Sequence, residues 1–194
     1  MNRKNTRLQS WTRTWGLILA SLLAAASVHA EMVELMLPNK LVAKADFRTG
    51  DASKPAVILL HGFLQTHTFP TISRLTEGLS NEGYTVLAPT LALGVTHRSQ
   101  SVACEALHTH TVANTAEELN AWVKWLKARK YKKLVLAGHS LGNMTNLAYL
   151  SSFPAHQIDK FIGISIVEGR LKIGENARGD LVRVLRAKVR SGDK

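Results

Sequence analysis

The sequence predicts an α/β fold in which helices cover both faces of a mostly parallel β-sheet. Short apolar runs rich in β-branched residues alternate along the chain with longer segments of helical period. Except for residues 41–47, which alternate in part, these runs lack the every-second-residue polarity of half-exposed strands, which indicates strands buried on both faces. Because no internal repeat or obvious linker divides the 194 residues, we expect a single domain of three layers.

The first half of the chain is expected to form three strands and one helix. Strands are predicted over residues 41–47, 56–60 (AVILL) and 84–88 (YTVLA), and Pro89 is expected to end the last of them. Residues 70–81 have the apolar spacing of an amphipathic helix and stop close to a glycine.

A long loop and a second helix follow. Residues 90–111 are too long for a plain connector, which indicates a functional or partly ordered loop. Residues 112–126 have helical spacing, and Thr115 with Glu118 is interpreted as a capping box. Cys104, the one cysteine of the chain, excludes an intramolecular disulfide and is expected to be a buried small residue.

The last third of the chain continues the alternation. We predict a strand over 134–137, a helix over 141–153 and a strand over 161–167 (FIGISIV). The resulting order of elements is that of a doubly wound sheet.

Residues 1–30 have the layout of a secretory signal peptide. A leader with four basic residues and no acidic one precedes the apolar run 15–28, and small residues allow cleavage after Ala30. The run is shorter than the roughly 20 residues of a membrane-spanning helix. We therefore expect a periplasmic or secreted bacterial protein with no stable membrane span, an uncleaved anchor being the alternative.

The net charge of +11 lies mostly outside the predicted folded body. Residues 1–30 carry +4 and residues 170–194 carry +5, whereas residues 31–169 hold 13 basic and 11 acidic residues. A nucleic-acid-binding protein concentrates its positive charge on the folded body, so this class is excluded. Residues 31–169 are the predicted core, and residues 170–194 form a basic tail that could begin a cap or connector helix.

A nucleophile motif stands between a predicted strand and a predicted helix. Gly138-His139-Ser140-Leu141-Gly142 matches G-x-S-x-G, and the strand-turn-helix setting is the one in which such a serine is pushed clear of the sheet. Gly138 and Gly142 are expected to be glycines because a side chain at either position would collide with the neighbouring strand and helix.

A second motif, His61-Gly62-Phe63, directly follows the buried strand 56–60. Acyl transfer needs two backbone N–H groups aimed at the developing oxyanion, and we assign these to Phe63 and Leu141. Gly62 allows close approach of the backbone. His61 is interpreted as a structural residue that holds its loop by hydrogen bonds.

These two motifs together resemble the α/β-hydrolase superfamily, over residues 41–169. The resemblance implies a three-layer α/β-hydrolase fold and a serine hydrolase of the esterase or lipase type, with Ser140 as the catalytic nucleophile. It implies an acyl-enzyme on Ser140, a small-molecule ester or acyl substrate, and neither a metal nor an organic cofactor. In this family the acid and then the histidine follow the serine along the chain.

The residues expected after Ser140 are incomplete in this sequence. Only one predicted strand follows the strand of the motif, and Glu168 behind it is the one candidate for the acid. His156, the only later histidine, is interpreted as a surface residue. Without the base that deprotonates the serine, we expect weak activity or none.

Three interpretations stay open. The chain can be truncated, so that the C-terminal strands are missing, and the connector-like tail favours this interpretation. It can instead be a non-catalytic exported binding or scaffold module on a degenerate hydrolase fold. A histidine of the long loop, His97, His108 or His110, can also replace the base. His108 and His110 could bind a metal from one strand face, but no second ligand cluster supports this, so no metal is expected.

Overall fold

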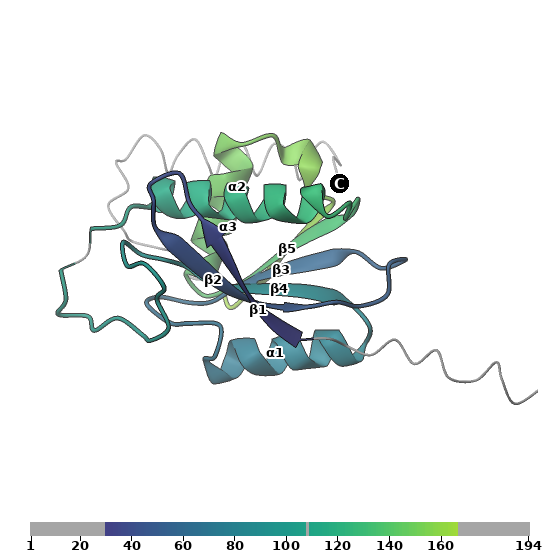
Figure 1. The fold of residues 1–194 in the computed structure, drawn as a ribbon, viewed down its shortest axis with the longest axis horizontal. Helices are drawn as coiled ribbons and strands as arrows, with labels where there is room; N and C mark the ends of the chain where they lie inside the picture. The colour runs from purple at the N-terminus through teal and green to yellow at the C-terminus, as the bar shows by residue number, and fades with distance from the viewer. Residues whose placement is uncertain (1–29, 108, 167–194) are drawn as a thin grey trace, which may run out of the picture.

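A computed structural model describes residues 30–107 and 109–166, which form a six-stranded sheet between helices (Figure 1). The predicted signal peptide before Ala30, His108, and the tail that includes Glu168 lie outside the described residues. The elements in chain order are β1 (Ala30–Met36), β2 (Val42–Arg48), β3 (Ala56–Leu60), α1 (Pro70–Asn81), β4 (Thr85–Thr90), α2 (Val112–Ala128), β5 (Leu134–His139), α3 (Gly142–Ser152), a 3-10 turn (Ala155–Gln157) and β6 (Lys160–Ile164).

The strand order of the sheet is β1-β2-β4-β3-β5-β6. Strands β3, β4, β5 and β6 are parallel, whereas β2 is antiparallel to both of its neighbours. Parallel strands need a crossover, and helices α1, α2 and α3 each connect one parallel strand to the next along the chain. The predicted α/β fold with a mostly parallel sheet is confirmed.

Helices cover both faces of the sheet. Helix α1 lies on one face, and α2 and α3 lie on the other (Figure 1). The central strand β3 serves both faces, because Ala56, Ile58 and Leu60 pack in the core cluster that includes α2, while Val57 and Leu59 pack in the cluster that includes α1. A strand buried on both sides has no polar face, which is why its sequence is uniformly apolar.

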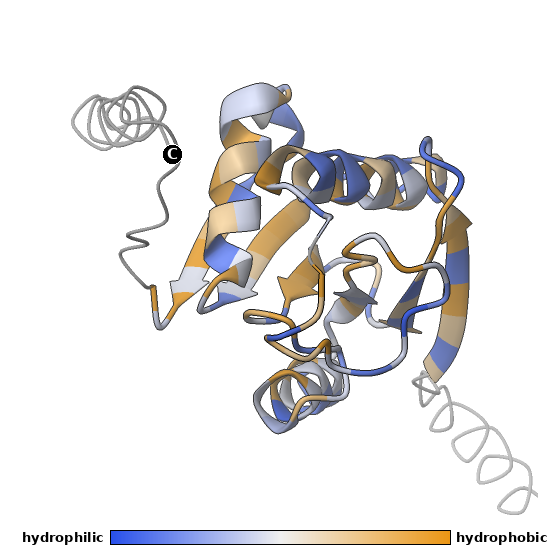
Figure 2. Cartoon of the chain, turned by 90° about the vertical axis from the view of Figure 1, so that its left-hand side faces the viewer, coloured by the Kyte–Doolittle hydropathy of each residue, from blue (hydrophilic) through white to orange (hydrophobic). Residues whose placement is uncertain are grey.

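One strand, β1, has no counterpart in the prediction. It forms an edge of the described sheet, pairs with β2, and exposes most of its residues, so it lacks an apolar run (Figure 2). A tight turn returns the chain to β2, with Lys40 at a φ of 66° and the Leu37 N–H donating to Leu41 O (2.8 Å). Pairing with β2, rather than its own pattern, makes this segment a strand.

Pro89 lies inside β4 and does not end it. The pairing of β4 with β3 reaches only Leu87, so on that side Pro89 interrupts no ladder hydrogen bond. On the other side β4 continues beside β2 through Thr90.

The predicted capping box at Thr115 and Glu118 is wrong. Helix α2 is capped by Thr111, whose Oγ1 accepts a hydrogen bond from the Asn114 N–H (3.1 Å). Thr115 and Glu118 lie inside the helix and are buried. The Glu118 carboxylate accepts a hydrogen bond from the Ala92 N–H (2.8 Å), a contact with the loop after β4 that the local pattern does not reveal.

Two further expectations are corrected. Cys104 is exposed on the long loop instead of being buried. Strand β6 ends at Ile164, earlier than predicted, because Ser165 takes a left-handed conformation with a φ of 49°. Within residues 30–107 and 109–166, no helix has the length and apolar character needed to cross a bilayer.

Candidate active site

Three loops meet at the edge of the sheet where the parallel strands end. They follow β3 (residues 61–69), β4 (residues 91–111) and β5 (residues 140–141). Figure 2 looks onto this edge, with the long loop after β4 in front. In open α/β sheets, ligands bind beyond the carboxyl ends of the strands, so this edge is where a site is expected.

Ser140 occupies a strained turn between β5 and α3. Its φ of 53° lies in the left-handed region, which a residue with a side chain adopts at an energetic cost. The turn is held against β6, because the Ser140 N–H donates to Ile164 O (3.0 Å). The Asn143 side-chain Nδ2 donates both to Ser140 O (2.9 Å) and to Ile164 O (3.0 Å).

Close packing around the turn leaves no room for a side chain at the motif glycines. A Cβ added at Gly142 would lie 2.6 Å from His61 O and 2.7 Å from Leu60 O. A Cβ at Gly138 would lie 2.7 Å from Asn146 Nδ2. The limit at these positions is space, because neither glycine has a positive φ.

The loop after β3 approaches the nucleophile turn closely. A Cβ added at Gly62 would lie 3.3 Å from Ser140 Cβ, which places the backbone before Phe63 beside the serine. On the other side, the Leu141 N–H donates to no acceptor among the described residues. Phe63 and Leu141 therefore flank the space next to Ser140, as an oxyanion hole requires.

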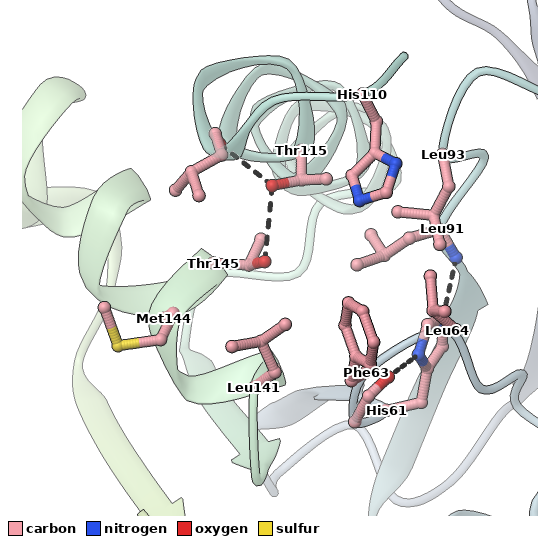
Figure 3. A pocket seen from close by; sticks show the side chains of 13 residues that line it. His61, Phe63, Leu64, Leu91, Leu93, His110, Thr115, Leu141, Met144 and Thr145 are labelled. Carbon is pink, nitrogen blue, oxygen red and sulfur yellow. Dashed lines mark hydrogen bonds between the residues drawn. The ribbon is translucent and has the colours of Figure 1, made fainter. Parts of the chain in front are cut away.

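A small cavity of about 50 Å³ opens beside Phe63 and Leu141, and Ser140 is not among the residues that line it (Figure 3). The loops after β3 and β4, the start of α2 and the start of α3 enclose it, and most of its wall is apolar. Its lining side chains include the apolar Phe63, Leu64, Leu91, Leu93, Val112, Leu141 and Met144 and the polar His61, His110, Thr115 and Thr145.

His61 is buried and holds the loops together. Its Nδ1 lies 2.7 Å from Gly62 O, and its Nε2 accepts a hydrogen bond from the Leu91 N–H (3.0 Å). A ring that accepts at Nε2 carries its one proton on Nδ1, so His61 is neutral. Burial agrees with this, because it lowers the pKa of His61 to about 3. The geometry matches the predicted structural role.

The rings of His67 and His97 bond Thr90 Oγ1 and Glu34 Oε1, not the Ser140 hydroxyl. His97 is exposed, with its Nδ1 3.3 Å from Glu34 Oε1, and His156 is exposed in the 3-10 turn. His110 points into the cavity (Figure 3). His108 and Glu168 lie outside the described residues. Within the described ranges, no three histidine, cysteine or acidic side chains gather as a metal site would need.

Two buried charged residues beside the site have roles that the sequence analysis did not predict. Arg98 and Glu118 are 5% and 4% exposed, and both contact the loops that surround Ser140. The unusual length of the loop after β4 was the one sequence signal that pointed to Arg98, whereas the local pattern assigned Glu118 to a helix cap.

Comparisons with known proteins agree with this fold. The strained serine turn, the facing loop and the parallel sheet together define a hydrolase-type α/β protein. A family model described as the alpha/beta hydrolase fold matches residues 55–182, and the chain belongs to that family. A search of curated protein sequences found no match.

Several solved structures resemble this chain. The Pyrococcus furiosus esterase Pf2001 is 26% identical, with a TM-score of 0.51 over 65% of this chain and 48% of that chain. A cold-adapted esterase from an Arctic intertidal metagenomic library is 18% identical, with a TM-score of 0.57 over 71% and 60% of the two chains. The α/β hydrolase GrgF from Penicillium sp. sh18 is 18% identical, with a TM-score of 0.62 over 86% and 57%. This chain thus spans about half to three-fifths of the length of these relatives.

Proposed function

We propose that this chain carries the nucleophile half of a serine esterase, which hydrolyses carboxylic esters through an acyl-enzyme on Ser140. One observation carries the proposal: Ser140 stands in a left-handed turn beside a facing backbone loop, with the Leu141 N–H available at the same place. The similarity to an esterase at 26% identity supports the same chemistry.

In the proposed reaction the Ser140 Oγ attacks the ester carbonyl carbon and its proton leaves to a base. The carbonyl oxygen becomes an oxyanion that accepts hydrogen bonds from the Leu141 and Phe63 N–H groups. Collapse of this intermediate breaks the bond to the alcohol and leaves the acyl group on Ser140. Water then attacks the acyl-enzyme, which releases the carboxylic acid and restores the serine.

The proposed activity of the chain as it stands is weak. The Ser140 hydroxyl has no hydrogen-bond partner among the described residues, so no described side chain takes its proton. Oxyanion stabilisation and binding alone leave only a residual acceleration. The same observation favours the second candidate, a non-catalytic binding module that holds an acyl compound without turning it over.

The proposed substrates are small esters with a short acyl chain. The cavity beside Phe63 and Leu141 is apolar and holds about 50 Å³, whereas one water molecule needs roughly 10–15 Å³. Such a space fits an acyl chain of about two to four heavy atoms.

We also propose export to the bacterial periplasm or medium, with the signal peptide removed after Ala30. Cleavage there would leave β1 paired with β2 from Glu31↔Phe47 onward, so the sheet would keep its edge strand. Determining the N-terminal residue of the protein recovered from the periplasm tests this; a protein that keeps residues 1–30 would contradict it.

Hydrolysis of p-nitrophenyl esters from acetate to dodecanoate tests the proposed reaction. We expect slow hydrolysis, fastest for acetate to butyrate, that disappears in Ser140→Ala. Ser151→Ala is a matched control, because this exposed serine on α3 bonds only the Ala148 carbonyl. Hydrolysis that is the same in Ser140→Ala and the unchanged chain would contradict an esterase. Retained binding of butyrate without any turnover would favour the binding module.

A further inference from the structure

The long loop after β4 buries an arginine against the loop that carries Phe63. Arg98 donates from Nη2 to Gln65 O (2.6 Å) and from Nη1 to Leu64 O (3.3 Å). It also donates from Nε to Leu91 O (2.6 Å) and from Nη1 to Gln100 O (2.8 Å). One side chain thus connects the loop after β3 with two parts of the long loop after β4.

The same guanidinium reaches His61. Its Nη2 lies 3.2 Å from His61 Nε2, which also accepts from the Leu91 N–H. Both neighbours of Nε2 are obligatory donors, so the ring proton must be on Nδ1. From Nδ1 it is donated to Gly62 O (2.7 Å), so Arg98 favours the tautomer that makes this bond.

This chain of hydrogen bonds ends on the peptide group that contains the Phe63 N–H. The carbonyl of Gly62 and the N–H of Phe63 belong to one planar peptide unit, so holding the oxygen fixes the direction of the N–H. On the other side of Phe63, the carbonyls of Leu64 and Gln65 are held by Arg98 directly. Leu64 also keeps a left-handed conformation, with a φ of 54°, which needs such support.

Burial of a charged guanidinium is costly unless its N–H groups are satisfied and a counter-charge is near. Here four carbonyl oxygens and a ring nitrogen surround Arg98, and the Glu118 carboxyl adds a stabilising charge when it is ionised, above about pH 7. Burial lowers the pKa of Arg98 only to about 10, so it stays charged at neutral pH. A lysine has its donors on one nitrogen and cannot reach these acceptors together.

We propose that Arg98 is a positioning residue that holds residues 62–65 so that the Phe63 N–H points at the substrate oxyanion. The inference rests on the proposed esterase function for its catalytic consequence. Its structural part, the fixed conformation of the loop, can be measured without any catalysis.

The test compares Arg98→Gln and Arg98→Lys with Arg74→Gln, a control at an exposed arginine of α1. The two quantities to measure are amide hydrogen exchange and the rate at which a small fluorophosphonate labels Ser140. Both Arg98 variants should exchange faster at residues 62–66 and label at least tenfold more slowly. In ester hydrolysis kcat should fall while KM changes little, because the oxyanion forms only in the transition state. Arg74→Gln should behave like the unchanged chain.

Each other outcome has a defined meaning. Faster exchange at residues 62–66 with unchanged labelling would overturn the positioning role and leave the esterase proposal intact. Faster exchange throughout β3, α2 and α3 would reduce Arg98 to a general stabilising residue and also overturn it. If the unchanged chain labels no better than Ser140→Ala, the esterase proposal fails. The exchange data then test the structural part alone. Exchange at residues 62–66 that is as slow in the Arg98 variants as in the unchanged chain would overturn it.

Discussion

At the scale of single residues, Glu118 is the unusual group near the site. It is buried on α2 and accepts a hydrogen bond from the Ala92 N–H in the loop after β4. Burial raises the pKa of Glu118 from 4.5 to about 7, although the Ala92 hydrogen bond and the charge of Arg98 both oppose the rise. Between about pH 4.5 and 7, Glu118 therefore keeps its proton in the folded protein, whereas it has lost that proton in the unfolded chain.

The stability contributed by this proton is fully present below about pH 4.5 and is lost as the pH rises through about 7. We expect Glu118→Gln, which keeps an acceptor for the Ala92 N–H, to remove this dependence. The free energy of unfolding of the unchanged chain, minus that of Glu118→Gln, should fall by up to about 3 kcal/mol over this window. Urea unfolding at several pH values measures it.

The comparison with Glu118→Gln is needed because the effect of His61 on the pH dependence of stability has the opposite sign. Its pKa is lowered to about 3 mainly by burial, so the stability that it contributes is present above about pH 6.5 and lost as the pH falls. Subtraction removes this contribution, which both chains share. Parallel stability curves for the two chains would show that Glu118 does not carry the raised pKa.

The sequence predicts some residues of the site well and others not at all. Ser140, Leu141 and Phe63 belong to short motifs whose neighbours in sequence are also their neighbours in space, so the pattern is enough to find them. Arg98 and Glu118 are 20 residues apart, one in the loop after β4 and the other in the helix that follows it, and only tertiary packing brings them together. A local pattern even suggested the wrong role for Glu118, as part of a cap.

At the scale of elements, the packing of α3 against β3 leaves no space for a side chain at position 142. We expect Gly142→Ala to lower the free energy of unfolding by about 1–3 kcal/mol, because its Cβ would meet the Leu60 and His61 carbonyls. Ser140 labelling should fall with it. Gly78→Ala in α1 is the matched control, because nothing lies within 4 Å of its added Cβ.

The control should change stability in the opposite direction. Gly78 lies inside a helix, where alanine is better than glycine by about 0.5–1 kcal/mol. Thermal and urea unfolding of both variants give the comparison. Equal stability of Gly142→Ala and the unchanged chain would mean that α3 does not pack as tightly on β3 as the structure has it.

The boundaries of the elements show why prediction succeeds in some segments. Strand β3 and helix α1 begin and end where predicted, because a continuous apolar run and a proline at the first helical turn mark them. Strand β1 and the last residues of β4 depend on pairing with β2, which no local pattern records. The boundaries of edge and irregular segments can be assigned only when the pairing of the whole sheet is known.

At the scale of the whole molecule, β6 is an edge of the described sheet and carries exposed apolar residues. Ile162 is 49% exposed on β6, and Ile166 just beyond it is 60% exposed. An unpaired apolar edge is a template for pairing with another chain. We expect the purified chain to self-associate at micromolar concentration, as light scattering would show.

Charge placed on this edge should reduce the association. Ile162→Lys is expected to lower the scattering mass more than Met36→Lys on the opposite edge strand β1, because β1 already carries the charges of Glu31 and Glu34. A monodisperse monomer with cooperative unfolding for the unchanged chain would contradict this expectation.

The central claim is that Ser140 is a nucleophile in an assembled elbow that faces a formed oxyanion loop. Incubation of the purified chain with a fluorophosphonate, followed by peptide mapping by mass spectrometry, tests it most directly. We predict slow labelling confined to Ser140 and absent from Ser140→Ala. Rapid, complete labelling would contradict the weak activity and point to an upstream histidine as base. Labelling no greater than that of Ser140→Ala would contradict the claim itself.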